Sequence, residues 1–246
     1  MDAARLLRRQ RRQEGAATPP PPPPPKEEPR PVVVEECYAP RLFEVDDERV
    51  LHIDQDPSGV LGAGVAATVW DAELVLAKLL QKRPELVRGR RVLVLGAGCG
   101  LLSVLAGCLG ALKVRATDRA IALGLTRRNV DRHRHLAPQV EVTELDWSAD
   151  KEDLPDDCDV VLGADLVYAS NADVHADLAA LLGRLLRRSV GFYAHENRGN
   201  AAVDRHFFRE LLPRNGVRHV VADDLDRSDV PDDDIRVFRL VAEASE

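Results

Sequence analysis

A glycine-rich turn between a buried strand and a helix is the first feature of this 246-residue chain that predicts chemistry. The apolar run Val92–Leu95 leads into Gly96-Ala97-Gly98-Cys99-Gly100, and the stretch Leu101–Leu109 that follows is typical of a helix. Glycines let the backbone turn tightly and approach a ligand closely, and a helix N-terminus presents unpaired N–H groups to a polar ligand. The segment therefore predicts a cofactor-binding turn.

Two classes of cofactor bind at such turns. A dinucleotide site has the spacing G-x-G-x-x-G/A, in which the last small residue lets the helix pack closely. Leu101 occupies that position here, so a dinucleotide fits poorly. The spacing G-x-G-x-G is instead typical of S-adenosyl-L-methionine sites. A turn of this kind can also be purely structural. The residues that follow the neighbouring strands therefore have to show whether a cofactor binds here.

Three further segments follow predicted strands. Asp118 follows the run Lys113–Thr117, where an acid would bind ribose hydroxyls; its alternative role is to cap the next helix. Trp147 follows the run Val140–Leu145, where its ring would stack on adenine or simply pack against the protein. Ala164-Asp165-Leu166-Val167-Tyr168 follows the run Asp159–Gly163. Because ligands of open α/β sheets bind outside the carboxyl ends of strands, all these segments are expected to meet at one edge.

The elements that position these segments alternate between short apolar runs and helical stretches. The runs are Val92–Leu95, Lys113–Thr117, Val140–Leu145, Asp159–Gly163, Val190–Ala194, Val217–Ala222 and Ile235–Val241. Connections up to about residue 214 are long enough for the helices that parallel strands require, whereas a polar, Asp-rich loop joins the last two runs. We predict an α/β fold with a doubly wound, Rossmann-like seven-stranded sheet, mostly parallel with an antiparallel final hairpin.

A small N-terminal β-hairpin and a helix should precede this sheet. Apolar residues alternate in Arg41–Val45 and Arg49–Ile53, on either side of an acidic turn, which is typical of a hairpin. A glycine-rich segment from Gly59 to Gly64 predicts a mobile loop, and Ala66–Leu80 shows the period of a helix, with Val69, Ala72, Leu76 and Leu79 on one face.

Residues 1–31 predict a disordered Arg- and Pro-rich tail, which leaves 32–246 for one folded domain. The tail begins with five arginines and continues into seven consecutive prolines, Pro19–Pro25, which form neither helix nor sheet. A solvated spacer is the simplest interpretation. A ligand for a proline-reading domain and a basic targeting segment are the alternatives.

Taken together, these segments resemble the seven-β-strand methyltransferases, and more narrowly methyltransferase family 16, the protein-lysine methyltransferases such as those acting on AAA-ATPase and Hsp70-type chaperones. The narrower resemblance rests on Val69-Trp70-Asp71-Ala72 before a helix, on the glycine turn with Asp118, on Leu145-Asp146-Trp147, and on Asp165-Leu166-Val167-Tyr168, which fits the family's D/E-x-x-Y/F motif. His195-Glu196-Asn197-Arg198 and Asp233-Asp234-Ile235-Arg236-Val237 also match later segments. The resemblance covers about residues 40–242.

The resemblance implies roles for the matching positions. Residues that would contact the cofactor S-adenosyl-L-methionine are Trp70, Gly96, Ala97, Gly98, Asp118, Trp147 and Ala164. Asp165 and Tyr168 would be the catalytic residues at a channel for the substrate lysine, and no metal is implied. The family usually has Glu two residues before the first glycine, where this chain has Val94. That acid commonly supports the loop and the methionine end of the cofactor.

The implied reaction needs a neutral lysine amine in line with the methyl group of a sulfonium. We expect Tyr168 to line the channel and Asp165 to hold the lysine or its backbone before deprotonation. Catalysis is then mostly alignment and desolvation, with water carrying the proton away.

Composition limits the partners. The net charge is −7 although residues 1–30 carry six Arg and one Lys against one Asp and three Glu, so the remainder is strongly acidic and unsuited to nucleic acid. Four cysteines, Cys37, Cys99, Cys108 and Cys158, lack metal-ligand spacing and predict reduced thiols in the cytoplasm, with the nucleus as a second compartment. No apolar run reaches about 18 residues, so we expect no membrane contact. We expect a monomer that acts on a protein, with a chaperone or an AAA-ATPase as candidates.

The remaining polar residues have simpler interpretations. The basic stretch Arg127–His135, which includes His133, is expected to be a solvated helix face. His175, His206 and His219 are expected at the surface or with ordinary partners. His195, Glu196 and Arg198 lie on the predicted site side, either lining the site or forming ordinary ion pairs. The Asp223–Asp234 cluster predicts a solvated loop or a docking surface for a basic protein.

Three other functions stay open beside a protein-lysine methyltransferase. One is a methyltransferase for another protein residue, such as histidine, or for a small molecule. Another is nucleic-acid amino-methylation, which is disfavoured because Asp165–Tyr168 stands where those enzymes have a Pro-Pro-aromatic motif. The last is a catalytically silent binding scaffold. Val94 favours a scaffold, and the set of Asp118, Trp147, Asp165 and Tyr168 opposes it.

Overall fold

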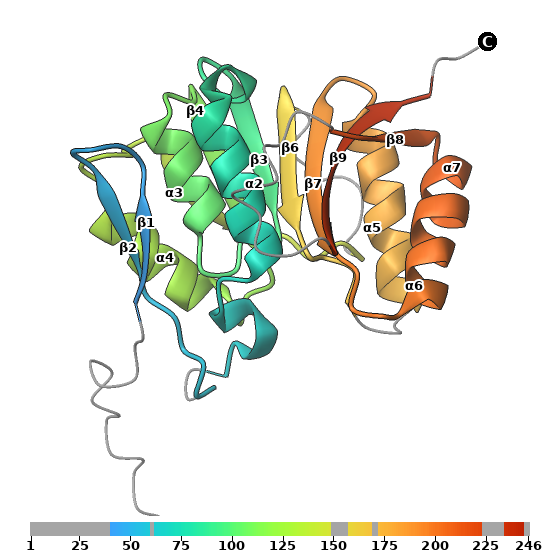
Figure 1. The fold of residues 1–246 in the computed structure, drawn as a ribbon, viewed down its shortest axis with the longest axis horizontal. Coiled ribbons are helices and arrows are strands. Elements are labelled where there is room, and N and C mark those ends of the chain that lie inside the picture. The colour runs from blue at the N-terminus through green and yellow to red at the C-terminus, as the bar shows by residue number, and fades with distance from the viewer. Residues whose placement is uncertain (1–39, 60–61, 149–156, 169–171, 223–233, 244–246) are drawn as a thin grey trace, which may run out of the picture. The chain divides into compact units, whose positions relative to one another are not determined.

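The seven apolar runs form one mixed sheet with the strand order β5-β4-β3-β6-β7-β9-β8 (Figure 1). Its strands are β3 (Arg91–Leu95), β4 (Lys113–Asp118), β5 (Val140–Glu144), β6 (Val160–Ala164), β7 (Val190–Glu196), β8 (Val217–Val221) and β9 (Ile235–Ala242). The first five run parallel, and β9 pairs antiparallel with both β7 and β8. The predicted fold class is therefore confirmed, including the antiparallel final hairpin.

The structure is a computed structural model, and it describes residues 40–59, 62–148, 157–168, 172–222 and 234–243. The predicted tail over 1–31 and most of the Asp-rich stretch lie outside the described residues. In the part of the chain that the structure describes, no helix is long and apolar enough to cross a membrane.

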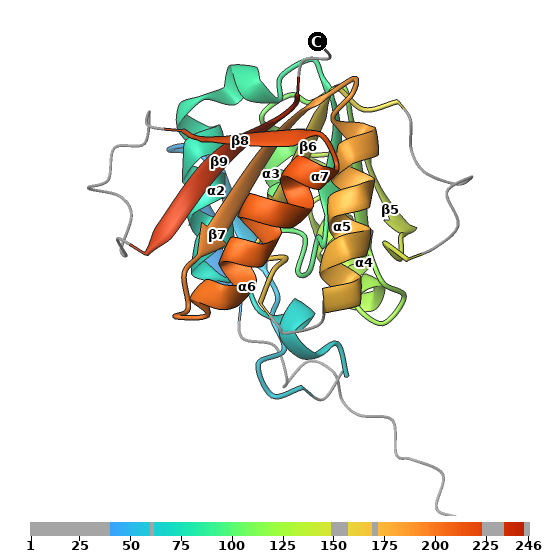
Figure 2. The ribbon, with the colours of Figure 1, turned by 90° about the vertical axis from the view of Figure 1, so that its right-hand side faces the viewer.

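Helices cover both faces of the sheet (Figure 2). They are α2 (Asp71–Lys82), α3 (Leu101–Cys108), α4 (Leu123–Arg132), α5 (Ala172–Leu185), α6 (Ala201–His206) and α7 (Leu212–Arg214), with 3-10 turns η2 (Gly64–Ala67) and η3 (Pro84–Leu86) and a π-helical turn η4 (Phe207–Leu211). Successive strand side chains point to opposite faces. Accordingly Val92 and Val94 pack in the core layer shared with α2 and α3, whereas Leu93 and Leu95 pack in the layer shared with α5, η4 and α7.

The N-terminal hairpin forms as predicted from β1 (Arg41–Glu44) and β2 (Val50–Ile53), which pair antiparallel. The residue after β2, Asp54, ties it to α4. The buried Asp54 carboxylate accepts hydrogen bonds from Arg128 at 2.7 Å and Arg132 at 2.8 and 2.9 Å. The Asn129 side chain also hydrogen-bonds both backbone groups of Asp54. This hairpin is therefore held against the helix that supports the glycine turn.

The prediction of a solvated face over Arg127–His135 is wrong in part. His133 is buried, its Nε2 accepts a hydrogen bond from the backbone N–H of His52 at 3.1 Å, and burial lowers its pKa. Arg128 and Arg132 bind Asp54 instead of facing solvent alone. A sequence pattern of charges could not reveal this, because the partners His52 and Asp54 lie in and just after β2, 74 to 81 residues earlier in the chain.

The predicted helix Ala66–Leu80 begins too early. The observed helix α2 starts at Asp71, since Thr68 and Trp70 both have extended backbones. Ala66 belongs to the short turn η2, and the Gln55 side chain accepts a hydrogen bond from Val69 N at 2.8 Å. Val69 is buried like the helical face residues but lies before the helix. The break places Trp70 at the start of α2 rather than within it.

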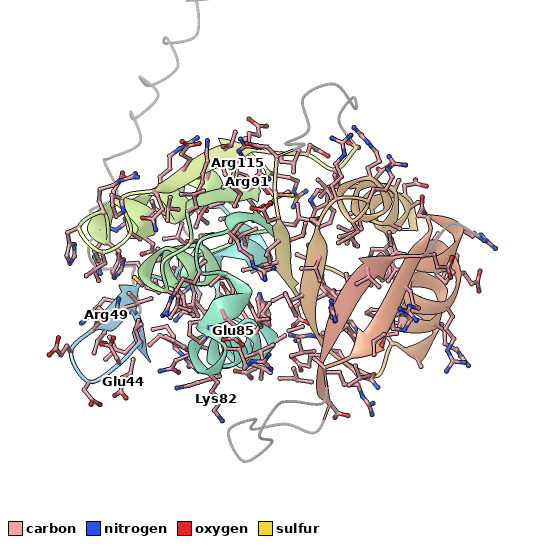
Figure 3. All side chains as sticks on the ribbon, turned by 90° about the horizontal axis from the view of Figure 1, so that it is seen from above. Glu44, Arg49, Lys82, Glu85, Arg91 and Arg115 are labelled. Atoms are coloured by element: carbon pink, nitrogen blue, oxygen red, sulfur yellow. The ribbon has the colours of Figure 1, made fainter. Side chains whose placement is uncertain are left out.

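Surface ion pairs join strands at the edge opposite the carboxyl ends. Arg91 at the start of β3 pairs with Asp159 at 2.6 Å, and Arg115 of β4 pairs with Asp157 at 3.5 Å; both arginines are labelled in Figure 3. Because these pairs are at least partly open to solvent, they contribute little to stability. None of these four residues lines the cavity at the carboxyl ends of the strands.

Candidate active site

A cavity of about 540 Å³ lies at the carboxyl ends of β3, β4 and β6, within the range of small-molecule sites. It is lined by Val65, Ala66, Thr68, Trp70, Glu73, Gly96, Gly98, Leu102, Asp118, Arg119, Leu145, Asp146, Trp147, Ser148, Ala164, Asp165, Leu166, Tyr168, Val174, His175, Asp177 and Arg198. All predicted site residues except Ala97 belong to this lining. The four sequence segments therefore do meet at one edge of the sheet.

The glycine turn after β3 has a conformation that only glycine adopts easily. Gly96 has φ +58°, and a Cβ there would lie 2.5 Å from Cδ2 of Leu166. Gly98 has φ +51°, and its Cβ would lie 3.2 Å from the carbonyl oxygen of Ala66. A side chain at either position would therefore strain the backbone and crowd a neighbour, and glycine keeps both positions open to the cavity.

Side chains of α4 hold this turn from behind. Thr126 Oγ1 donates a hydrogen bond to the Gly98 carbonyl at 2.7 Å, and Asn129 Nδ2 donates to the Cys99 carbonyl at 2.8 Å. With these carbonyls bonded, the turn is a rigid part of the fold. Ala97 takes part differently: its N–H donates to the Thr117 carbonyl at 2.9 Å and its side chain is buried. Its predicted cofactor contact thus has no support from the cavity lining.

Asp118, at the end of β4, is joined to the glycine turn. Its Oδ2 accepts a hydrogen bond from Gly98 N at 2.9 Å, and its Oδ1 accepts one from Arg119 N at 2.8 Å. Burial raises its pKa against the opposing effect of these bonds. The alternative role of a helix cap is wrong, because α4 begins after Ala122 with no side-chain cap. Asp118 instead faces the cavity, where an acid suits a pair of hydroxyls.

Two tryptophans stand in the cavity wall. Trp147 is half-buried near Gly96, whose hypothetical Cβ would lie 3.8 Å from the indole ring. Trp70 is held by a hydrogen bond from its Nε1 to the Val65 carbonyl at 2.9 Å. The Arg198 guanidinium lies over the Trp70 ring, 4.5 Å from its centre. The cavity thus has an aromatic surface beside the glycine turn and a second one at α2.

Asp165 adopts a strained backbone, with φ +50°, and is the one non-glycine residue of the described chain with a positive φ. Strand β7 holds it there. Asp165 N donates to the Ala194 carbonyl at 2.9 Å, and the buried hydroxyl of Tyr193 accepts hydrogen bonds from Leu166 N at 3.1 Å and Val167 N at 3.2 Å. Strain of this kind persists where the surrounding structure enforces it, often at functional sites.

The Asp165 carboxylate is already engaged on both oxygens. Oδ1 accepts a hydrogen bond from Glu196 N at 2.9 Å, and Oδ2 accepts one from Arg198 Nη2 at 2.7 Å. The same Nη2 lies 2.7 Å from the Glu196 carboxylate. A substrate lysine would have to compete with Arg198 for Asp165. The observed contacts of Asp165 therefore position this loop, whereas the predicted role was to hold the substrate lysine or its backbone.

Tyr168 is 49% exposed, although it also lines the cavity. Val174, in the first turn of α5, is another exposed apolar residue of the lining. An aromatic residue at the mouth is where a long side chain entering from outside would first meet the protein, so the position fits the channel predicted for Tyr168.

His195 does not line the cavity but lies behind Asp165. Its Nδ1 is 3.9 Å from Asp165 Oδ1, and its Nε2 is 3.1 Å from Asp204 Oδ1. Neither ring nitrogen makes a well-aligned hydrogen bond within the described residues. The ring also packs 5.1 Å from that of Phe208. His195 is therefore a buried side chain that packs between the carboxylates of Asp165 and Asp204.

Sequence reasoning missed several lining residues. Glu73 is the clearest: it is buried in the first turn of α2, and burial raises its pKa to about 8. His175, expected at the surface or with an ordinary partner, is buried in the lining, and burial lowers its pKa. Acids in a first helical turn are common because they favour the helix dipole. No signal in the sequence separated Glu73 from that ordinary use.

The lining fits a nucleoside with a charged amino acid tail. Glycines give close backbone approach, Asp118 offers a carboxylate for ribose hydroxyls, Trp147 offers a stacking surface, and Glu73 adds a buried acid further along the wall. Among the described residues, no group of three His, Cys, Asp or Glu side chains is arranged to hold a metal ion.

Comparison with solved structures identifies the class of fold. The 16S rRNA N2 G1207 methyltransferase RsmC of T. thermophilus, solved with AdoMet and guanosine, superposes with a TM-score of 0.54 at 18% identity, over 85% of this chain and 51% of that chain. At this identity the likeness shows a methyltransferase fold and nothing about substrate.

Sequence comparison identifies the family. The family model described as lysine methyltransferase matches residues 45–214, so the chain belongs to that family, which confirms the resemblance. The mouse protein N-lysine methyltransferase METTL21A is 41% identical over 125 residues, 50% of this chain and 56% of the relative. The EEF1A lysine methyltransferase 3 of Xenopus tropicalis is 34% identical over 151 residues, 61% of this chain and 66% of the relative. The chain thus covers less than two thirds of either relative.

Proposed function

We propose that this protein transfers a methyl group from S-adenosyl-L-methionine to a lysine side chain of a protein substrate. The observation that carries the proposal is the junction of the glycine turn with Asp118, where Gly98 N donates to the Asp118 carboxylate inside the cavity. Membership of the lysine methyltransferase family supports the same activity.

The residues that would hold the cofactor follow from their positions. Gly96 and Gly98 would admit it against the backbone, Asp118 would bind its ribose hydroxyls, and Trp147 would stack on its adenine. When bound, the cofactor supplies an electrophilic methyl group on a cationic sulfonium. Trp70, Ala164 and the buried Asp165 line the remaining wall, and the exposed Tyr168 lies at the mouth.

Catalysis by these residues is a matter of alignment and proton loss. A lysine with an ordinary pKa near 10.4 pays roughly 4–5 kcal/mol to become neutral at pH 7. A cationic neighbour and removal of water both lower that pKa. Tyr168 would guide the side chain at the mouth, and Asp165, held by Arg198, would keep the loop in place while water takes the proton.

The proposal also covers the class of substrate protein, the oligomeric state and the cellular compartment. We propose a chaperone or an AAA-ATPase, with EEF1A, which is named for one relative, as the competing candidate. We further propose that the enzyme is a monomer of the cytoplasm, with the nucleus as a second compartment. Sedimentation of the purified protein and imaging of a tagged chain test these two statements.

The test is transfer of labelled methyl from S-adenosyl-L-methionine into lysate proteins resolved by size. Asp118→Ala is the loss-of-function variant, and Glu141→Ala, an exposed acid at the opposite end of β5, is the matched control. We expect discrete labelled bands with wild type and Glu141→Ala, and their loss with Asp118→Ala. Labelling that persists in a correctly folded Asp118→Ala variant would refute the assigned site.

A further inference from the structure

A buried carboxylate stands in the cavity wall apart from the residues that the motifs identify. Glu73 projects from the first turn of α2 toward the start of α3 and is only 8% exposed. Its Oε1 accepts one long hydrogen bond, 3.4 Å, from the backbone N–H of Leu102. Within the described residues, its second oxygen has no hydrogen bond, although the residue lines the cavity.

The surroundings of Glu73 contain no compensating cation in the part of the chain that the structure describes. The groups that act on it are the Asp118 carboxylate, which raises its pKa, and the Leu102 N–H, which lowers it. The Cys99 thiol on the glycine turn also lies within the electrostatic reach of Glu73. A buried carboxylate without a cation is costly to keep charged, so its charged form needs a partner from the cavity.

The cavity as a whole favours a cation. Its lining carries five acids, Glu73, Asp118, Asp146, Asp165 and Asp177, against the two arginines Arg119 and Arg198. Arg198 is already paired with Asp165 and Glu196. Among these acids, Glu73 combines deep burial with an oxygen that has no hydrogen bond within the described residues.

We propose that Glu73 binds the ammonium group at the amino acid end of the cofactor, an inference that rests on the proposed function. Asp118 and Trp147 lie on the β4 and β5 side of the glycine turn, where the nucleoside would bind, whereas Glu73 lies on the α2 side. A ligand that spans the turn would therefore bring its tail to Glu73. An ammonium offers both positive charge and N–H donors, whereas a sulfonium offers charge alone, so the ammonium matches an oxygen that lacks a hydrogen bond.

The experiment compares two ligands that differ at this end. S-adenosylhomocysteine carries the ammonium, and 5′-methylthioadenosine lacks the amino acid moiety. Calorimetric titration of the full chain should show that Glu73→Gln weakens S-adenosylhomocysteine ten- to a hundredfold and changes 5′-methylthioadenosine less than twofold. Glu141→Gln, an exposed acid on β5, is the matched control and should change neither. Melting curves establish that each variant is folded.

The pH dependence gives a second readout. Since Glu73 must lose its proton to bind a cation, wild-type affinity for S-adenosylhomocysteine should rise about tenfold between pH 6 and pH 8, with proton release, and Glu73→Gln should be flat. Equal affinity of variant and wild type, equal weakening of both ligands, or affinity that falls with pH would overturn the role of Glu73 and leave the proposed function standing. Wild type that binds neither ligand would refute the proposed function itself.

Discussion

The Arg198 guanidinium lies 4.5 Å from the centre of the Trp70 ring. Through the same group Arg198 donates to the buried Asp165 carboxylate at 2.7 Å. One side chain from the segment after β7 therefore connects the wall at α2 with the strained turn after β6. Cation–π contacts contribute about 0.5–2 kcal/mol, and removing one member of a buried pair costs more than the pair contributes.

Arg198→Ala should loosen both walls of the site. We expect a loss of about 1–2 kcal/mol of unfolding free energy, since Arg198 is itself partly exposed. We expect kcat/KM to fall at least tenfold. Arg198→Lys should restore a charge near Asp165 but not the planar guanidinium over the Trp70 ring, and so recover stability better than activity. Urea unfolding and steady-state kinetics measure the two effects; unchanged stability of Arg198→Ala would contradict the coupling.

Tyr193→Phe tests how β7 supports the Asp165 turn. The substitution removes the acceptor for Leu166 N and Val167 N while keeping the ring. Leaving buried N–H groups unpaired costs about 1–3 kcal/mol, so we expect a lower unfolding midpoint and faster amide exchange at these two residues. Exchange that stays as slow as in wild type would show that the hydroxyl does not hold the turn.

The two residues assigned to the lysine channel should differ in their effects. Tyr168→Ala removes an exposed ring at the mouth and should raise KM for the protein substrate about tenfold, with affinity for S-adenosylhomocysteine unchanged. Asp165→Asn keeps an acceptor for Glu196 N but loses the ion pair with Arg198, so it should lower kcat. Full activity of Asp165→Asn beside an inactive Tyr168→Ala would make the carboxylate peripheral.

Stability should depend on pH through Glu73. Burial raises its pKa to about 8 in the folded protein, from an ordinary value of 4.5. The folded state therefore binds the proton more tightly than the unfolded state, and the contribution to stability, complete below pH 4.5, is lost as pH rises toward and through 8. At about 1.4 kcal/mol for each pKa unit, Glu73→Gln should gain roughly 3–5 kcal/mol over wild type between pH 5 and pH 9. Urea unfolding without ligand measures this, and a pH-independent difference would contradict it.

The sequence predicted the strands well because each is a short apolar run whose ends are marked by glycine or a polar residue. Leu95 ends β3 before Gly96, and the predicted end at Thr117 is one residue short of Asp118, the last residue of β4; both ends also placed the site. The start of α2 was predicted too early because the apolar period continues back through Val69, while the backbone there is extended. Periodicity records which side chains are buried, and it does not record where the backbone turns.

The parts of the site that were missed depend on contacts between distant elements. Glu73 resembles an ordinary acid of a first helical turn until α2 packs against α3 and buries it. The sequence did show one departure from the family pattern, which is Val94 in place of the usual Glu. Val94 packs in the core layer that includes α2. Glu73 supplies from the neighbouring helix a carboxylate that β3 lacks. His133 was misjudged for the same reason, because its partner His52 lies on the N-terminal hairpin.

The most direct test of the central claim is the identity of the methylated residue. Protein labelled by the wild-type chain with methyl from S-adenosyl-L-methionine is hydrolysed to amino acids, and the labelled species are separated. We expect the label in methylated lysine, absent with Asp118→Ala and retained with Glu141→Ala. Label in methylhistidine, or in a small molecule with none in protein, would contradict the assignment of a protein-lysine methyltransferase.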